Sequence, residues 1–307
     1  MRHLLSLLDW SGPELRENLA LARELKQHTR NGACPQLLSG RHYALIFHKN
    51  SLRTRVSFEV GIRQLGGSSM ILTEQDFKLG ERESVADVAR VLSRYVDGIL
   101  IRTYGHEMVE ELAQHATVPV VNMLSDFSHP CQIMADALTI EEHLGPLEEA
   151  VVTYLGDGNN VTHSWINLAA RLPFELRIGT APETVPDLEL VAQAQEAGAG
   201  RIQVVHSAQE AVSGANVLYT DVWASMGEKE KTAERRALLR DFQINSDLLR
   251  LASPNAIVMH CLPAERGVEI TDEVLDGPQS VVWDQAENRL HAQKAILVQL
   301  ERWRQPS

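Results

Sequence analysis

The segment from residue 48 to residue 55 combines cationic and hydroxyl side chains in an order that suits anion binding. It follows an apolar run that ends at Phe47, and a helical pattern comes after it. A helix start offers unpaired backbone N–H groups and the positive end of the helix dipole. Arg53 adds a planar fork that matches phosphate oxygens, and Ser51 and Thr54 add hydroxyl groups. The alternative is an ordinary capped helix with arginines on its surface.

Three further polar residues occur where strands end or helices begin. Arg102 closes a predicted strand, and His129 and Gln132 open a predicted helix. Ligands bind at strand ends in open α/β sheets. An arginine, a neutral histidine and a glutamine at such a place suit a carbonyl oxygen that gains negative charge. The alternative is a structural histidine satisfied by backbone and an arginine on the surface.

A glycine turn at residues 155–161 raises the question of a dinucleotide site. The third glycine of the dinucleotide fingerprint is replaced by Val161. The next predicted strand ends near Thr180 without the acidic residue that would bind a ribose. Two features are therefore missing, and the turn is better interpreted as presenting Asn160 to a small ligand.

Residues that suit an amino-acid ligand follow later strands. Asp221 is placed to pair with an α-ammonium, and Ser225 to hold an α-carboxylate. The alternative for Asp221 is a helix cap before a loop. Cys261 follows another strand, where a small buried residue is the alternative. Arg289 begins the last helix and either faces a ligand or covers apolar surface with its stem.

The elements that must position these residues alternate between strand and helix along the chain. Apolar strands joined by amphipathic helices, such as 85–95 after the N-cap Ser84, predict parallel sheets covered on both faces. Ten strands are many for one sheet, so we expect two doubly wound α/β domains. The predicted strands are 43–47, 69–73, 99–104, 118–123, 151–155, 176–180, 202–206, 217–222, 257–261 and 281–284.

The predicted domain boundary follows the helix 132–144. Gly145 and Pro146 form a helix stop, so the first domain spans 1–144 and the second 145–286. The last segment, 287–307, contains a helix that we expect to pack back on the first domain. The charged segment 227–240 is interpreted as a solvated helix for most of its length.

Composition excludes several functional classes. The formal net charge of −12 argues against a nucleic-acid partner, because such a protein needs a basic face. The chain has no run of about 20 apolar residues, so we expect no membrane span. Three cysteines do not form a disulfide framework, and the short apolar stretch near the N-terminus does not resemble a signal peptide. We therefore expect a cytoplasmic protein.

Taken together and in this order, the motifs resemble the aspartate/ornithine carbamoyltransferase family over nearly the whole chain. The most specific segments are 51–55, 129–132, 221–227 and 260–263. The Ser-Met-Gly loop after Asp221 and the His-Cys-Leu-Pro segment resemble the ornithine branch. The resemblance implies two α/β domains with the active site between them, no metal or organic cofactor, and a homotrimer or a multiple of trimers. The implied reaction joins carbamoyl phosphate and L-ornithine to give L-citrulline and phosphate.

The resemblance also assigns residues to the two ligands. It implies catalytic roles for Arg102, His129, Cys261 and Arg289. The residues implied for carbamoyl phosphate are Ser51, Leu52, Arg53, Thr54, Lys78, Arg102, His129 and Gln132. Those implied for ornithine are Asn160, Asp221, Ser225, Met226, Cys261 and Leu262.

The chain departs from the ornithine-branch pattern at two positions. Leu52 replaces a usual Thr, which keeps the backbone N–H but removes a hydroxyl. Some N-acylornithine carbamoyltransferases also carry Leu at this position, which makes an acylated substrate the alternative. Lys78 stands where Gln is frequent, in a loop that reaches a neighbouring subunit's site in this family; the alternative is a solvated lysine.

Overall fold

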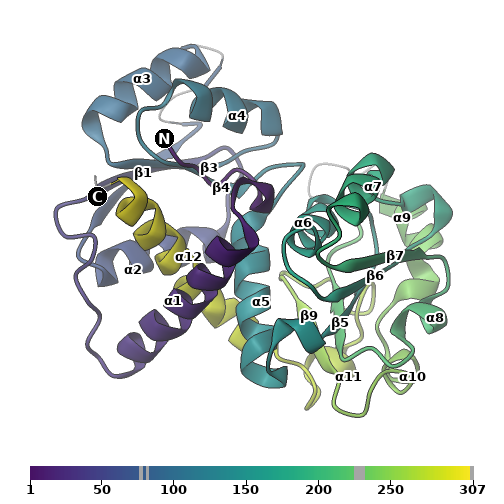
Figure 1. Ribbon diagram of the computed structural model, residues 1–307. Coiled ribbons are helices and arrows are strands. Elements are labelled where there is room, and N and C mark those ends of the chain that lie inside the picture. The colour runs from purple at the N-terminus through teal and green to yellow at the C-terminus, as the bar shows by residue number, and fades with distance from the viewer. Residues whose placement is uncertain (76–78, 81–82, 225–231, 305–307) are drawn as a thin grey trace. The chain divides into compact units, whose positions relative to one another are not determined.

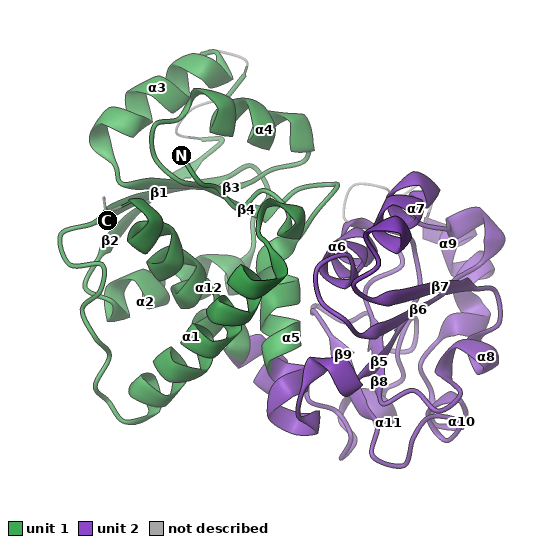
Figure 2. Cartoon of the chain, in the orientation of Figure 1, with its two compact units in different colours: residues 1–138, 288–307 green, residues 139–287 purple. Residues whose placement is uncertain are grey.

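The computed structural model describes residues 1–75, 79–80, 83–224 and 232–304 of the chain (Figure 1). The chain forms two compact units, shown separately in Figure 2. Unit 1 consists of Met1–Leu138 and Asn288–Ser307, and unit 2 of Thr139–Glu287. The limits of the units fall inside helices α5 (Pro130–Leu144) and α12 (Val282–Arg304) rather than at their ends.

Unit 1 is built on a parallel four-stranded sheet with the order β2-β1-β3-β4. Strands β3 and β4 are almost entirely buried, and β1 is buried after its first residue. Burial on both faces explains why these strands are continuous apolar runs without alternation. The strands are β1 (His42–Phe47), β2 (Ser68–Thr73), β3 (Gly98–Arg102) and β4 (Val120–Leu124).

The helices of unit 1 form a layer on each side of this sheet. Figure 1 shows α3 and α4 on one face and α1, α2 and α12 on the other. Helix α3 begins as predicted, because the Ser84 hydroxyl accepts a hydrogen bond of 3.1 Å from the backbone N–H of Asp87. Besides α5 and α12, the helices are the 3₁₀ turn Leu7–Asp9, α1 (Gly12–Arg30), α2 (Leu52–Gln64), α3 (Val85–Tyr95) and α4 (His106–His115).

Unit 2 is built on a parallel five-stranded sheet with the order β7-β6-β5-β8-β9. One face carries an aromatic cluster in which the rings of Tyr154 and Tyr219 lie 5.8 Å apart. Trp165, from α6 (Asn160–Ala169), meets Tyr219 edge-on at 5.6 Å. The strands are β5 (Val151–Leu155), β6 (Glu175–Gly179), β7 (Arg201–Val205), β8 (Val217–Thr220) and β9 (Ile257–His260).

The opposite face of this sheet packs on α8, α10 and α11, whose apolar residues join one buried cluster with Leu155 and Val258. The α-helices of unit 2 are α6 (Asn160–Ala169), α7 (Leu188–Ala197), α8 (Ala208–Val212), α9 (Thr232–Leu239), α10 (Ser246–Leu249) and α11 (Asp272–Leu275). Short 3₁₀ turns cover Leu147–Glu149, Pro182–Thr184 and Arg240–Phe242.

The predicted two-sheet α/β fold is confirmed, with one strand wrong. Nine predicted strands are present among the described residues, but the tenth, 281–284, is the start of α12. Val281 donates a backbone hydrogen bond of 3.0 Å to Val258 of β9, and the chain then turns into the helix. The apolar residues at this point therefore make only a short contact with the edge of the sheet, which the sequence pattern does not distinguish from a strand. The helix predicted at 132–144 ends at Leu144, before Gly145 with φ +89°.

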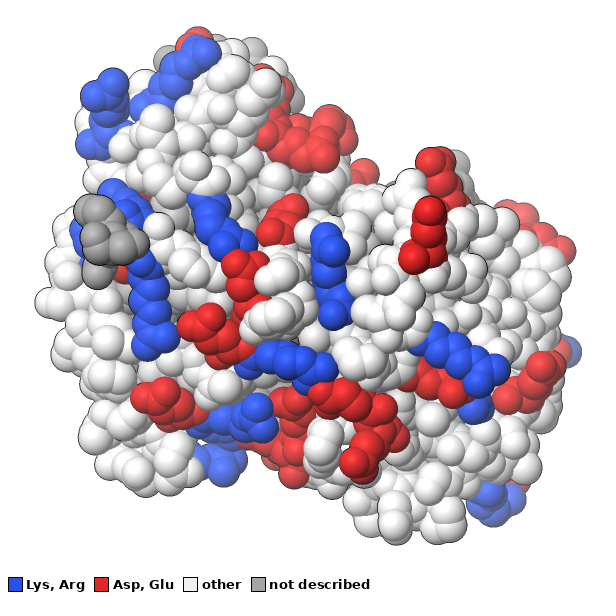
Figure 3. Space-filling view, in the orientation of Figure 1, with Lys and Arg blue, Asp and Glu red and all other residues white. Residues whose placement is uncertain are grey.

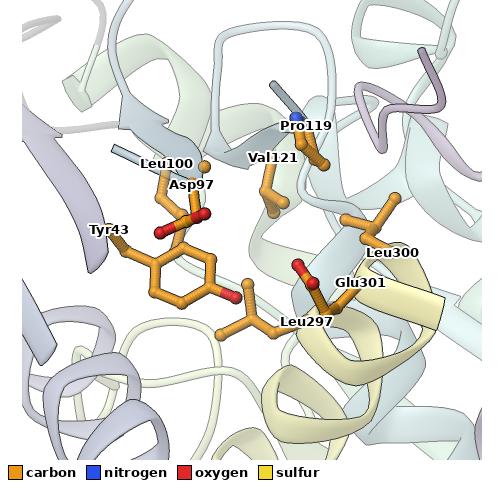
Figure 4. A pocket seen from close by; sticks show the side chains of 9 residues that line it. Tyr43, Asp97, Leu100, Pro119, Val121, Leu297, Leu300 and Glu301 are labelled. Carbon is orange, nitrogen blue, oxygen red and sulfur yellow. The ribbon is translucent and has the colours of Figure 1, made fainter. Parts of the chain in front are cut away.

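The C-terminal end of α12 is held on the sheet of unit 1 by charged residues. Arg304 and Arg41 both donate to the Asp97 carboxylate, at 2.9 and 3.2 Å, and Arg41 also pairs with Glu301. Figure 4 shows Tyr43, Asp97 and Glu301 around a small cavity, of about 10 Å³. Burial, with the carboxylates of Glu301 and Asp97 nearby, raises the pKa of Tyr43. These contacts hold the helix whose first turns carry Arg289.

The surface charges are mixed in sign. On the face shown in Figure 3, Lys and Arg lie scattered among Asp, Glu and uncharged residues. Within the ranges described above, no helix combines the length and apolar character needed to cross a membrane.

Replacing Gly158 by Ala should destabilise unit 2 by about 3 kcal/mol, the upper end for an overpacked site, because the added Cβ meets backbone. That atom would lie 2.2 Å from the Pro186 nitrogen and 2.4 Å from the Val185 carbonyl carbon. Gly214→Ala is the matched control: φ is +67° but nothing lies within 4 Å, so about 1 kcal/mol is expected. Urea unfolding measures both, and equal costs would contradict the backbone clash.

Candidate functional site

In each unit, some candidate residues follow the strands between which the strand order reverses. In unit 1 this point lies between β1 and β3, and in unit 2 between β5 and β8. Ligands of open α/β sheets bind at such points, because crossover helices lead away on opposite sides.

The start of α2 forms the first part of the site in unit 1. Ser51 is the N-cap, and its hydroxyl accepts a hydrogen bond of 3.4 Å from the backbone N–H of Thr54. The first turn contains no Asp or Glu that would compete with an anion. Leu52 is 77% exposed. Its side chain has no hydrogen-bond donor, so its backbone N–H is the group that it offers to an anion. Arg55 lies on the exposed side and pairs with Glu59 at 3.1 Å.

The buried Thr54 hydroxyl is the point on which three donors converge. Arg102 approaches it at 3.3 Å, Arg289 at 3.4 Å and the Ser51 hydroxyl at 3.1 Å. Thr54 is 1% exposed and both arginines are buried. Two guanidinium groups that share one neutral oxygen concentrate positive charge in a place of low polarity, where it attracts an anion more strongly than in water.

Amide side chains orient Arg289 from two sides. Its Nη1 donates to Gln132 Oε1 at 2.5 Å, and Gln132 in turn donates to the buried carboxylate of Asp136 at 2.8 Å. With the Gln293 amide in the orientation that satisfies its neighbours, its oxygen accepts from Arg289 at 2.9 and 3.1 Å, and its nitrogen donates to Ser57 at 2.7 Å. The Ser57 hydroxyl bonds to the Arg53 carbonyl at 2.7 Å, so this chain of contacts links α12 to α2.

His129 is the buried histidine beside these arginines. Burial lowers the pKa of His129 well below its usual value, and the positive charges of Arg289, Arg102, Lys49 and Arg53 lower it further. The imidazole is therefore neutral near pH 7, and a neutral ring donates one hydrogen bond without adding a charge. The same four cations that suppress its protonation form the positive field that would stabilise a phosphate.

The candidate site in unit 2 centres on the buried carboxylate of Asp221, directly after β8. The Cys261 thiol donates to Asp221 Oδ1 at 2.9 Å, and the Asn159 amide donates to Oδ2 at 3.3 Å. Asp221 is 8% exposed, and these two donors orient its carboxylate oxygens. A buried carboxylate that accepts hydrogen bonds from neutral donors is suited to receive an ammonium group.

The glycine turn after β5 places Asn159 against Asp221. Asn159 is the N-cap of α6, and its side-chain oxygen accepts from the backbone N–H groups of Val161 and Thr162. Its amide nitrogen is then directed to Asp221. Asn160 is the first residue of the helix. Gly158 allows this tight path, because a side chain there would meet Val185 and Pro186.

The segment after β9 is held by His260 and Glu269, both fully buried. His260 Nδ1 accepts from the backbone N–H of Leu262 at 2.8 Å, so Nε2 carries the proton and donates to Glu269 at 2.9 Å. This holds Leu262 at φ +56°, a conformation that is rare for Leu.

Asp221, His260 and Cys261 have ligand atoms within 4.8 Å of one another, which raises the question of a metal ion. Both ring nitrogens of His260 already form hydrogen bonds within the protein. A metal ion would have to displace one of them, so this residue set fits the hydrogen-bond network better than a metal centre.

Both halves of the chain match one family. Residues 2–142 match the aspartate/ornithine carbamoyltransferase carbamoyl-P binding domain, and residues 148–300 match the Asp/Orn binding domain. The chain belongs to the aspartate/ornithine carbamoyltransferase family. The predicted family is thus confirmed, and with it the enzyme class, a carbamoyltransferase.

Family members with curated names and solved structures resemble the chain over its length. It is 51% identical to the ornithine carbamoyltransferase of Methanoculleus marisnigri, over 97% of this chain and 96% of that protein. A structure of ornithine carbamoyltransferase from Pyrococcus furiosus superposes with a TM-score of 0.92 at 49% identity, covering 96% of each chain. The anabolic ornithine carbamoyltransferase structure from Campylobacter jejuni gives 0.93 at 34% identity, covering 99% of this chain and 100% of that chain.

The structure gathers most residues that the sequence singled out for this carbamoyltransferase fold. In unit 1 the side chains of Ser51, Thr54, Arg102, Gln132 and Arg289 are joined by hydrogen bonds. In unit 2, Cys261 contacts Asp221 and Leu262 contacts His260. Lys78, Ser225 and Met226 lie outside the described residues.

Several residues that support the site in this family member were not foreseen from the sequence. They are Asn159, Asp136, Ser57, Gln293 and the His260–Glu269 pair. The spacing of Gln132 and Asp136, four residues apart on one helix, was a usable signal. The pairing of Gln293 with Ser57 has no local signal, since the residues belong to different helices.

Replacing Gln293 by Leu should lower kcat/KM for carbamoyl transfer by up to about a hundredfold, because Arg289 loses an acceptor that orients it. Gln299→Leu is the matched control. Gln299 is equally buried on the same helix but contacts Asn18 and the Glu14 carbonyl instead. Steady-state kinetics and thermal midpoints of both variants separate the two roles. Equal losses of activity would show that Gln293 supports only packing.

Proposed function

We propose that this protein is an ornithine carbamoyltransferase, which transfers the carbamoyl group of carbamoyl phosphate to the side-chain amine of L-ornithine to give L-citrulline and phosphate. The observation that carries the proposal is a division of charge. Unit 1 gathers buried cations at its switch point, and unit 2 presents a buried carboxylate at its own. The first arrangement suits carbamoyl phosphate and the second suits the α-ammonium of an amino acid.

Carbamoyl phosphate is assigned to the start of α2 and the arginines around Thr54. The phosphate binds the backbone N–H groups of Ser51–Thr54, including that of Leu52, with Arg53 and the Ser51 hydroxyl. The carbamoyl oxygen accepts from Arg102, His129 and Thr54, with Gln132 holding the carbamoyl amide. Lys78, which lies outside the described residues, is assigned to the phosphate as well.

Ornithine is assigned to unit 2. Its α-ammonium pairs with Asp221, whose two oxygens are oriented by Cys261 and Asn159. The loop with Ser225 and Met226 holds the α-carboxylate, and Asn160 and Leu262 complete the contacts. The side-chain amine must lose a proton before it attacks, since an ammonium has no lone pair. Its usual pKa is near that of lysine, about 10.4, and the positive charge of Arg289 favours the neutral form.

The reaction is then a direct transfer. The amine attacks the carbamoyl carbon, and negative charge develops on the carbamoyl oxygen, where donors such as Arg102 and His129 are worth about 3–4 kcal/mol each in comparable sites. The bond from the carbamoyl carbon to the phosphate oxygen breaks, and phosphate departs into the positive field of Arg53, Arg102 and the helix start with the proton that the attacking nitrogen loses. The Cys261 thiol orients Asp221 and lines the reacting centre, and no covalent intermediate on sulfur is needed.

An N-acylornithine is the competing substrate. Its α-nitrogen is an uncharged amide, so it would leave the buried Asp221 carboxylate without a cation, at a cost of kcal/mol. Leu52, the residue that kept this alternative open, is 77% exposed and has no polar side-chain group for the acyl carbonyl. Asp221 therefore favours free ornithine.

The decisive experiment measures citrulline production from carbamoyl phosphate with free ornithine, and in parallel with N-acetylornithine, N-succinylornithine, putrescine and aspartate. Turnover is expected with free ornithine only. Asp221→Asn should raise KM for ornithine about 10–100-fold, the loss of a charged hydrogen bond, with KM for carbamoyl phosphate nearly unchanged. Turnover with an acylated ornithine alone would contradict the assignment of Asp221.

We also propose that the enzyme works in the anabolic direction, in arginine biosynthesis, in the cytoplasm. Similar proteins from Pyrococcus furiosus and Campylobacter jejuni bear the name anabolic. The three cysteines of the chain are free thiols, as a reducing compartment would keep them.

The proposed oligomer is a homotrimer that buries the outer face of α2. Leu52, Val56 and Val60 follow one another at intervals of four residues on this helix and are 77, 48 and 38% exposed. Met70, on the neighbouring edge strand β2, is 45% exposed. An apolar stripe beside an unpaired strand edge is typical of a surface that a second copy covers.

Val60→Glu should therefore shift the protein from trimer to monomer, because it places a charge in an apolar interface. Leu188→Glu is the matched control, since Leu188 is 58% exposed on α7 of unit 2. Light scattering after size exclusion gives the masses. A wild-type monomer, or a trimer that persists in Val60→Glu, would contradict this interface.

A further inference from the structure

A second group of reactive side chains lies in unit 1, away from the Thr54 cluster. Cys34, in the loop after α1, lies 3.8 Å from the amine of Lys294 on α12. Lys294 also donates to the Thr29 hydroxyl and, at 3.0 Å, to the Gln64 amide oxygen. The Thr29 oxygen is 3.2 Å from the Cys34 sulfur. Three parts of the chain that are distant in sequence, residues 29–34, Gln64 and Lys294, thus bring one thiol and one amine together.

Lys294 is a buried amine without a carboxylate partner among the described residues. Its exposed fraction is 0%, and the atoms within hydrogen-bond distance are a hydroxyl, an amide oxygen and a thiol. Burial lowers the pKa of Lys294, whereas the neighbouring Cys34 opposes this shift. A buried ammonium is costly without an anion, and Cys34 is the only member of the group that can become one.

The lysine is held in this place by close packing. A Cβ added at Gly61 of α2 would lie 3.1 Å from Lys294 Cγ, so the lysine stem packs closely against the backbone of this helix. The Thr29 hydroxyl bonds to the Leu25 carbonyl at 2.7 Å and is fixed as well. The amine therefore stays directed at the sulfur.

The other two cysteines have different surroundings. Cys131 is fully buried, and burial raises the pKa of its thiol to about 12. The Cys261 thiol donates a hydrogen bond to the Asp221 carboxylate, and a negatively charged neighbour favours the thiol over the thiolate. Cys34 is partly exposed and faces a cation, the combination that makes a cysteine reactive.

We propose that Cys34 and Lys294 form an oxidation site that reacts with hydrogen peroxide and closes to a covalent sulfenamide between the two side chains. In the first step the Cys34 thiolate attacks one peroxide oxygen and the O–O bond breaks. Lys294 donates a proton to the departing oxygen, which leaves as water. Sulfur is oxidised to a sulfenic acid, the peroxide is reduced, and Lys294 is left as a neutral amine.

In the second step the Lys294 nitrogen attacks the Cys34 sulfur. The S–N bond forms, the S–OH bond breaks, and the hydroxyl leaves with one amine proton as water. The thiol and the amine have together lost two hydrogens to one peroxide. Two molecules of a thiol reductant restore both groups and form a disulfide between themselves, so the modification is reversible.

The test treats the full-length protein with hydrogen peroxide, blocks free thiols in acid, and identifies the digested peptides by mass spectrometry. The expected product joins the peptides of Cys34 and Lys294, has two hydrogens fewer than their sum, and disappears after treatment with a thiol reductant. Cys34→Ser and Lys294→Met should both abolish it. Lys294→Met keeps the length of the side chain and removes only the amine.

A second measurement needs no variant and so does not depend on folding. In the untreated wild-type protein near pH 7, iodoacetamide should alkylate Cys34 at least about tenfold faster than Cys131. The proposal is overturned if Cys34 remains a free thiol while Cys261 takes up oxygen, or if Cys34 proceeds to sulfinic acid without a link to Lys294. It is also overturned if Cys34 and Cys131 are alkylated at similar rates.

Discussion

The organisation of unit 1 depends on one buried hydroxyl, that of Thr54, to which two arginines from distant parts of the chain donate. Arg102 comes from the end of β3 and Arg289 from the start of α12, which is 235 residues beyond Thr54. The two guanidinium groups approach the same oxygen, so their like charges repel. The neutral oxygens of Thr54, Gln132 and Gln293 hold them in place. The positive potential that causes this repulsion would also stabilise an anionic substrate.

This requirement explains why the C-terminal helix belongs to the first unit. Helix α12 must present Arg289 to α2, and its far end is held on the sheet by Arg304, Arg41 and Asp97. Between these ends, buried polar contacts such as Asn18 with Gln299 and Lys26 with Asn288 tie it to α1. Buried polar groups are stable only with partners, so these contacts define the position of the helix closely.

In unit 2, neutral side chains orient a buried negative charge in a similar way. The Asp221 carboxylate is oriented by the Cys261 thiol and the Asn159 amide, and the segment after Cys261 is held by His260 and Glu269. Asn159 serves twice, as the cap of α6 and as a donor to Asp221. From the sequence, the glycine turn predicted that its neighbour Asn160 binds the ligand, and the contact of Asn159 with Asp221 was not foreseen.

Sequence alone determined the two-sheet α/β fold, nine of its strands within the described residues, and the family, because apolar runs, caps and motifs are local patterns. It also selected Thr54, Arg102, Gln132 and Arg289, whose residue types suit the chemistry. Only the tertiary structure decided which partners orient them. Ser57 with Gln293, Asp221 with Asn159 and Cys34 with Lys294 are meetings of side chains from separate elements. The packing of helices and strands creates such contacts, and no spacing along the chain encodes them.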